Sequence, residues 1–285
     1  MLIQTTQKLF LLAMLAGLTT LQVACNNTNT AQPNTAQPNT APTETTKSET
    51  TKSETTKSTT TDAAQDQNII DAHIAAVGGS TAIKKIKTIT KSWAVSTTAP
   101  TGNGNGTSNE MFDLVAERGR IDLDLGVYKE SKGWSGQKGW KQSTFETLRD
   151  LTADELGLDK IAGPISLIFT IKDIFGSVAF LPPTKAKFNG QDCVKVKIVE
   201  SPLELYVNGK TKLLEGIEVP SLMKLTFSNY QESNGVQVAH NTKVEITALN
   251  TTVLSELKKF TVNEKLDEVK FSKPANKNAA PKGDF

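Results

Sequence analysis

Cysteine and histidine are scarce in this chain of 285 residues. Its two cysteines, Cys25 and Cys193, cannot make a disulfide framework. Its two histidines, His73 and His240, leave little material for a zinc site or a histidine-based catalytic relay. An excess of one sign of charge is also lacking, because 32 basic and 30 acidic residues give a net charge of +2. A polyanionic partner is therefore not expected, and nucleic-acid binding is disfavoured.

Residues 1–24 are predicted to be a lipoprotein signal peptide. Lys8 is followed by an apolar run over residues 9–18, which is too short for a comfortable membrane-spanning helix. The stretch ends in Ala24-Cys25, which resembles the bacterial lipobox, in which a small residue precedes the cysteine that receives the lipid. Gln22 departs from the aliphatic residue that usually stands in that place. Cys25 is the expected lipid-attachment site, and the alternative is a chance cysteine near an ordinary cleavage site.

The resemblance to a lipoprotein also implies a location. Such a cysteine typically carries several acyl chains, palmitate among them, and more than one chain makes membrane anchoring stable. Asn26 follows Cys25, whereas aspartate in that position signals inner-membrane retention in enterobacteria. The chain is therefore expected in the bacterial cell envelope, facing the periplasm or the surface, and on the outer membrane if the host is diderm.

Residues 25–62 are predicted to form a disordered, threonine-rich tether behind the lipidated cysteine. They contain Ala-Gln-Pro-Asn-Thr twice over residues 31–40 and Glu-Thr-Thr-Lys-Ser three times over residues 44–58. Apart from Cys25, no side chain in the tether is more apolar than alanine or proline, so it cannot bury enough surface to offset its ordering entropy. A spacer role and repeat slippage without a selected length both remain open.

One folded domain is expected over residues 63–274, followed by a disordered tail over residues 275–285. The domain begins with an apolar stripe of helical period, after which Gly78-Gly79 ends the helix. The stripe consists of Ile69, Ile70, His73, Ile74 and Val77. Ser80 can cap a second short helix.

From residue 87 onward the apolar period falls to two, which predicts strands with one apolar and one polar face in an antiparallel sheet. The clearest runs are 121–127, 194–198, 203–207, 223–228 and 236–246. Asn189-Gly190, Asn208-Gly209 and Asn234-Gly235 lie between such runs and predict hairpins. The Gly-Asn repeat over residues 101–106 is expected to be a loose hairpin loop.

One stretch breaks the strand pattern. Residues 152–156 are typical of a capped helix start. Residues 161–175 then form a run that is apolar on nearly all sides, as in a helix that is buried or covered by something apolar. The two interpretations are a core helix packed on the sheet and a lid over a lipid cavity.

No motif supports catalysis, and we expect no enzyme, no cofactor and no metal site. Residues 133–137 lack the second framing glycine and the strand–turn–helix setting of a nucleophile elbow. Asp122 and Asp124 share a strand face of the kind that is usually solvated. The two histidines are interpreted as core or rim side chains. Cys193 is in phase with Lys195, which favours an exposed thiol.

The order of the elements resembles the LolA/LolB-like superfamily, in particular bacterial proteins labelled outer-membrane lipoprotein-sorting protein-like. The segments that carry the resemblance are residues 69–89, 136–140, 189–196, 234–240 and 263–274. Ala239 stands where the family commonly has proline. The resemblance implies an α+β fold that is mostly antiparallel β, a curved incomplete barrel with short helices covering its concave side.

The resemblance also implies a function, namely binding of a lipid or lipoprotein acyl chain in an apolar cavity, in the context of lipid or lipoprotein sorting. A monomer is expected. The expected cavity residues are Trp93, Leu123, Leu125, Phe169, Ile171, Phe175, Val196, Phe227 and Val244. The alternative is a surface-exposed structural or interaction lipoprotein with a filled core. Residue identities do not separate the two, because cavity linings and cores use the same side chains.

Overall fold

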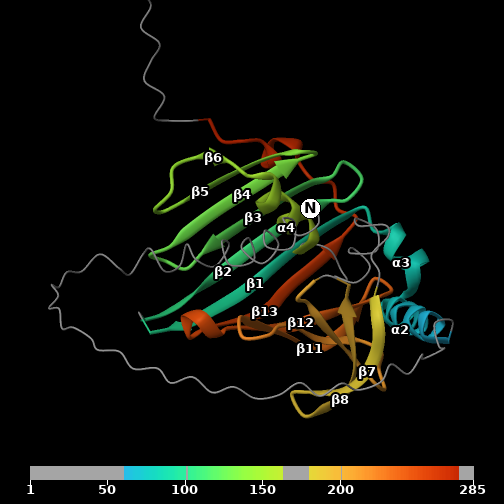
Figure 1. The fold of residues 1–285 in the computed structure, drawn as a ribbon. Helices are drawn as coiled ribbons and strands as arrows, with labels where there is room; N and C mark the ends of the chain where they lie inside the picture. The colour runs from blue at the N-terminus through green and yellow to red at the C-terminus, as the bar shows by residue number, and fades with distance from the viewer. Residues whose placement is uncertain (1–60, 101, 163–179, 200, 276–285) are drawn as a thin grey trace, which may run out of the picture.

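The structure is a computed structural model, which describes residues 61–100, 102–162, 180–199 and 201–275 (Figure 1). The helices are α2 (Thr61–Val77), α3 (Gly79–Lys85) and α4 (Ala153–Ala162), with short 3-10 helices η1 (Thr247–Leu249) and η2 (Glu268–Phe271). The first strands are β1 (Thr88–Ala99), β2 (Gly102–Asp113), β3 (Arg118–Asp124), β4 (Lys129–Ser135), β5 (Lys138–Ser143) and β6 (Arg149–Asp150). The later strands are β7 (Phe180–Phe188), β8 (Gln191–Ile198), β9 (Glu204–Asn208), β10 (Leu214–Val219), β11 (Met223–Ser233), β12 (Val236–Ile246) and β13 (Thr251–Val262).

These strands form one antiparallel sheet in the order β6-β5-β4-β3-β2-β1-β13-β12-β11-β10-β9-β8-β7. Sequence neighbours pair as hairpins throughout, except at two places. β1 lies in the middle of the sheet and pairs with both β2 and β13. β6 and β7 follow each other in sequence but occupy opposite edges. The segment that begins with α4 therefore joins one edge of the sheet to the other.

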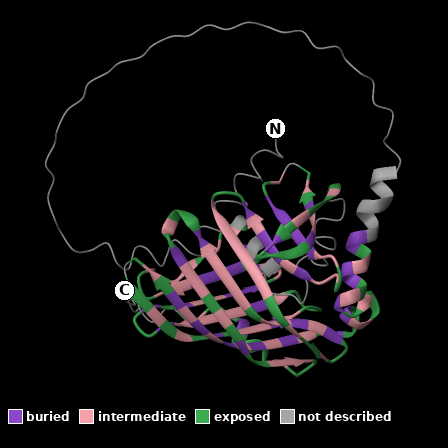
Figure 2. Cartoon of the chain, turned by 90° about the horizontal axis from the view of Figure 1, so that it is seen from below, coloured by how far each residue is buried: buried purple, intermediate pink, exposed green. Residues whose placement is uncertain are grey.

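The sheet curves into an incomplete barrel that stays open between β6 and β7 (Figures 1 and 2). Strand β1 alternates between buried and half-buried positions along most of its length, so one face looks into the concave side. The buried set on that face includes Ile89, Trp93 and Val95. The observed architecture confirms the fold class predicted from the sequence.

Helices α2 and α3 cover one end of the concave side, and the predicted apolar stripe explains why. Ile70, Ile74 and Val77 are buried, as is His73. Gly78 ends α2 with a φ of 130°, and a Cβ at this position would lie 2.2 Å from the carbonyl oxygen of Gly235. The chain can pass this close to the β11–β12 turn only without a side chain.

Two turn predictions need correction. Ser80 is not the N-cap of α3, because the helix starts at Gly79 and Gly78 is its N-cap, without a side-chain hydrogen bond. The Gly-Asn repeat is not a loop but the first half of β2, paired with β1 from Ala99↔Gly102 onward. Glycine is needed inside this strand, since a Cβ on Gly106 would lie 1.7 Å from the carbonyl oxygen of Asp124.

The three Asn-Gly hairpins are confirmed. Asn189-Gly190 joins β7 to β8 and Asn234-Gly235 joins β11 to β12, and in both pairs the two residues have positive φ values. That geometry is the one that a tight hairpin turn requires. Asn208-Gly209 opens a longer turn between β9 and β10, closed by a hydrogen bond from the Asn208 amide to the Leu213 carbonyl.

Cys193 is buried, contrary to the exposed thiol expected from its phase. On the convex face it packs with Phe188 and Tyr206, whose rings stack with centroids 4.6 Å apart. These two side chains come from β7 and β9, the strands on either side of β8, and together they cover the thiol. Burial raises the pKa of Cys193, which leaves the thiol protonated and unreactive.

The edges of the sheet are short or interrupted. β6 has two residues, Arg149 and Asp150. β7 contains Pro182 and Pro183, and its pairing with β8 shifts register between Leu181 and Thr184. Proline cannot donate a ladder hydrogen bond, so it is tolerated in an edge strand such as β7.

Candidate ligand-binding face

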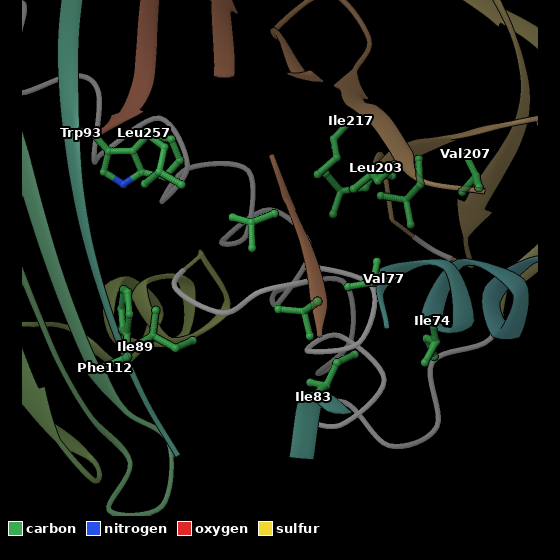
Figure 3. Packing of buried hydrophobic residues seen from close by; sticks show 14 of the residues in the cluster. Ile74, Val77, Ile83, Ile89, Trp93, Phe112, Leu203, Val207, Ile217 and Leu257 are labelled. Carbon is green, nitrogen blue, oxygen red and sulfur yellow. The ribbon is translucent and has the colours of Figure 1, made fainter. Parts of the chain in front are cut away.

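The concave face has two differently built ends. Under α2 and α3 it is aliphatic and closely packed, and the fully buried side chains there are Ile70, Val77, Val196, Leu205, Val207, Ile217 and Val236. Figure 3 shows Val77, at the end of α2, near the group of Leu203, Val207 and Ile217, and all four belong to one buried cluster with Ile74. This end has the composition of an ordinary hydrophobic core.

The other end, formed by β1 to β5, carries three rows of side chains that run across the strands. The registers align one row as Ile89, Phe112, Gly119, Trp134 and Gly139. The next row is Lys91, Glu110, Ile121, Lys132 and Lys141. The third is Trp93, Ser108, Leu123, Glu130 and Ser143. A row of charges therefore lies between an aromatic row and a mixed row, on the face that looks inward.

The aromatic row depends on glycine. The Phe112 and Trp134 ring centroids are 6.0 Å apart, with the rings tilted by 46°. The indole of Trp134 occupies the space above Gly119, where an added Cβ would lie 2.1 Å from it. A side chain at Gly119 would therefore displace the indole and open the row.

The charged row is held by ion pairs. Lys91 pairs with Glu110 at 3.4 Å, and Lys141 pairs with Glu130 at 3.1 Å. The Tyr128 hydroxyl donates to Glu130 at 2.6 Å. Lys91, Glu130 and Lys141 are all at least nine-tenths buried. Buried charges are tolerated only when they are paired in this way.

Helix α4 supplies the partner of the remaining lysine. Asp159 of α4 accepts a hydrogen bond from the Lys132 ammonium, and Asp159 is itself buried. Burial alone would lower the pKa of Lys132, but the carboxylates of Asp159 and Glu130 outweigh it and the pKa is raised. Burial raises the pKa of Asp159, and Lys132 offsets this only in part. The pair fixes α4 above the charged row.

The start of α4 is fixed independently, which confirms the predicted capped helix start. The Thr152 amide donates to the Glu155 carboxylate at 2.9 Å, and the Glu155 amide donates to the Thr152 hydroxyl at 3.3 Å. This reciprocal arrangement is a capping box. Arg149 binds the same carboxylate through two nitrogens, at 2.7 and 2.8 Å. Hydrogen bonding from Arg149 lowers the pKa of Glu155 to about 2.

The predicted cavity residues are spread over the concave face. Trp93 and Leu125 are buried and Leu123 is half-buried, all near β1 to β3. Phe227 and Val244 are half-buried in the middle of the sheet, and Val196 is fully buried toward α2. Phe169, Ile171 and Phe175 lie outside the described residues, as does most of the expected apolar helix over residues 161–175. Cys25, the signal peptide and the tether up to residue 60 lie outside them as well.

The histidines occupy the positions expected of core and rim side chains. His73 is buried, with Nδ1 2.9 Å from the Lys212 carbonyl oxygen, and burial lowers its pKa. His240 is half-buried on β12 in phase with Val238 and Val244. In the described parts of the chain, no group of three or more histidine, cysteine and acidic side chains could hold a metal ion. No helix within those parts is both long and apolar enough to traverse a bilayer.

Asp122 and Asp124 pair with neighbouring cations, as expected of a solvated strand face. Arg120 binds Asp122 with its Nε 2.8 Å from Oδ2, and Lys129 binds Asp124 at 2.7 Å. Both carboxylates are partly exposed. Each carboxylate therefore has a cationic partner.

The charged row was missed by sequence reasoning, although a signal for it exists. Lys91 lies two residues from Ile89 and two from Trp93, so the strand period alone places it on the inner face. Glu110 stands in the same relation to Phe112. A charged residue in phase with buried aromatics could have been recognised as an inward-pointing charge.

Comparison with known proteins identifies the fold. No protein-family model and no curated protein matches the sequence. Among solved structures, the chain is similar to a DUF1329 family protein from Desulfovibrio piger, with a TM-score of 0.51 and 12% identity over 73% of this chain and 97% of that one. It is also similar to a putative outer membrane lipoprotein-sorting protein domain from Vibrio parahaemolyticus, with a TM-score of 0.50 and 13% identity over 74% of this chain and 97% of that one.

The structural likeness confirms the LolA-like fold that the sequence motifs predicted. The likeness covers nearly the whole of both matched chains. It therefore concerns the whole curved sheet of the open barrel and not a single shared hairpin. At identities of this size the comparison establishes the fold, and function has to be argued from the site.

Proposed function

We propose that this protein binds an acyl chain of a lipid or lipoprotein on the concave face of its sheet. The observation that carries the proposal is a strip of apolar side chains that are only half-buried, although they point inward. The strip has two parts, which are separated by β2 and β1: Ile121 and Leu123 on β3, and Leu225, Phe227, Val244 and Val253 on β11 to β13. Inward apolar residues of a filled core are normally buried as fully as Leu205 is.

The energetics support an apolar ligand. Each methylene that the strip removes from water contributes about 0.8 kcal/mol. The matched Vibrio parahaemolyticus structure is described as a putative outer membrane lipoprotein-sorting protein domain, which agrees with a ligand of this kind. We infer a carrier or acceptor role in the bacterial envelope and no catalytic role.

The proposed attachment extends this role to the membrane. Acylation of Cys25 would hold the domain on the envelope, with residues 26–62 as the tether and the outer membrane as the expected location. Labelling with radioactive palmitate in the native host tests the anchor. We expect label in the wild type and none in Cys25→Ala, and equal label in both would exclude lipidation at this residue.

Ligand binding is tested on the full chain carrying Cys25→Ser, which cannot be acylated. Native mass spectrometry reports co-purified lipid, and titration with a fluorescent fatty acid measures affinity. Leu123→Glu on the inner strip should weaken binding at least tenfold, because a buried carboxylate would face the chain. Leu254→Glu is the matched control, since Leu254 is 47% exposed and neighbours the inward Val253 on β13.

The alternative is an interaction lipoprotein with a filled core. The aliphatic end under α2 and α3 is fully packed, so for this end of the concave face the filled-core interpretation is favoured. If the wild-type chain carries no lipid and binds no acyl probe, the filled-core interpretation replaces ours for the whole concave face.

A further inference from the structure

We propose that the charged end of the concave face recognises the ester carbonyl of an esterified acyl chain, through the indole N–H of Trp93 beside the Lys91–Glu110 pair. The inference rests on the proposed function and specifies its ligand class. An ester-linked acyl lipid would bind with its oxygen-bearing end at β1 and β2 and its chain along the apolar strip.

The unpaired indole of Trp93 is the first observation. Trp93 is 9% exposed, and its Nε1 is a buried donor with no hydrogen-bond partner within the described part of the chain. A buried donor left unpaired costs about 1–3 kcal/mol, so such groups usually have a reason to persist. Trp140 offers a contrast, because its Nε1 donates to the Phe271 carbonyl oxygen at 3.2 Å on the convex face.

The surroundings of the donor are polar. Lys91 lies two residues before Trp93 on the same face, and its ammonium is 6.0 Å from the Trp93 ring centroid and 5.4 Å from that of Phe112. In Figure 3 the nitrogen of Trp93 lies on the side of the ring that faces Ile89 and Phe112. Lys91 and Trp93 are both buried on the same face of β1. An acceptor oxygen at the Trp93 donor would therefore lie in the same buried region as the Lys91 ammonium.

The charge balance decides between a neutral and an anionic acceptor. The buried cations Lys91, Lys132 and Lys141 are matched by Glu110, Asp159 and Glu130. A carboxylate ligand would add an uncompensated negative charge to this buried group, at a large desolvation cost. A neutral ester carbonyl accepts the same hydrogen bond without that cost. The arrangement therefore favours an esterified acyl chain over a free fatty acid.

The experiment uses three probes of equal chain length, namely monopalmitoylglycerol, palmitate and hexadecane, with the full chain carrying Cys25→Ser. The chain has 3 tryptophans, so an indole nitrogen–proton NMR spectrum contains few signals, which Trp→Phe variants assign. We expect the Trp93 signal to move with monopalmitoylglycerol and to stay with hexadecane. We also expect the ester to bind about tenfold more tightly than hexadecane, which corresponds to one hydrogen bond in a buried site.

Variants separate the donor from its surroundings. Trp93→Phe should reduce the preference for the ester over hexadecane to about one, because phenylalanine keeps an apolar ring but has no N–H donor. Lys91→Met should reduce the same preference in part. Trp140→Phe is the matched control and should keep the full preference, because its donor serves the Phe271 carbonyl on the other face.

The outcomes are distinguishable. If the ester binds and the Trp93 signal does not move, or if the ester and hexadecane bind equally, the polar subsite is overturned while acyl binding stands. If palmitate binds more tightly than the ester, the choice of a neutral acceptor is wrong. If no probe binds at all, hexadecane included, the proposed function fails and this inference fails with it.

Discussion

The two ends of the concave face use the same strand geometry for different purposes. Under α2 and α3, inward positions are aliphatic and closed to solvent, as at Val196, Leu205 and Ile217. Under α4, inward positions alternate between rings, charges and half-buried aliphatic groups. Both ends belong to one contiguous cluster of buried residues.

This difference indicates that the two ends of the concave face have different roles. Replacing a buried ion pair by apolar groups often leaves stability unchanged or improves it, so buried pairs such as Lys132–Asp159 are weak evidence for stabilisation. The aliphatic end supplies stability, and the charged end holds polar groups in fixed positions facing inward. The proposed ligand-binding role would explain why this end uses buried charges where apolar side chains would serve stability equally well.

The largest expected effect concerns the aliphatic end. Leu205→Ala should destabilise the protein by about 3 kcal/mol, because a fully buried leucine leaves a cavity that the neighbours fill only in part. Leu123→Ala on the half-buried strip should cost about 1 kcal/mol, since less surface is lost there. Urea unfolding of both variants measures the contrast. Equal losses would show that the two ends are packed alike.

The next effect tests the ion pair under α4. Lys132→Met should cost about 2 kcal/mol, because Asp159 is left buried without its cation, and protonation of Asp159 relieves only part of the penalty. The double variant Lys132→Met with Asp159→Leu should regain most of that loss. A double variant as unstable as the single one would mean that the pair contributes directly to stability.

A smaller effect is expected at the start of α4. Glu155→Gln should cost about 1 kcal/mol at neutral pH, through the loss of the charged capping interaction and its Arg149 partner. The folded pKa of Glu155 is about 2, below its ordinary 4.5, so this stabilisation is present above pH 4.5 and is lost as pH falls toward 2. The difference between wild type and variant should therefore vanish in acid. Thermal melts across this pH range provide the measurement.

The smallest effect serves as the reference for the others. Lys258 pairs with Glu256 on the surface of β13, with side chains 52% and 61% exposed. Lys258→Ala should change stability by less than about 0.5 kcal/mol, since exposed pairs of this kind contribute little. A loss as large as that of Lys132→Met in the same urea assay would remove the distinction between buried and surface pairs.

The elements that were predicted correctly depend on local signals. The Asn-Gly turns, the Gly78-Gly79 helix end and the Thr152–Glu155 capping box each encode their geometry within a few residues. Alternating runs such as Val194 to Ile198 are similarly self-contained. Together with the ordered motifs, these signals were sufficient for the fold class.

The features that were missed depend on which strands become neighbours. Gly106 lies in a strand position where the Asp124 carbonyl leaves no room for a Cβ, and nothing near residue 106 in the sequence indicates that approach. Cys193 is covered by aromatic side chains from the two flanking strands. The charged row requires the registers of β1 to β5 together with the arrival of Asp159 from α4. Local periodicity could place Lys91 and Glu110 on the inner face, but the partners of these residues and the other two features are tertiary contacts that it could not predict.

The edges of the sheet affect whether neighbouring copies of the protein can associate. The proposed lipid anchor would hold such copies side by side at high local density. An unpaired strand edge is a template on which another chain can add, and long flat edges promote aggregation. Here one edge offers only the two residues of β6, and the other is interrupted by Pro182 and Pro183. Within the described part of the chain, the two edges of the open sheet therefore offer neighbouring copies little strand on which to polymerise.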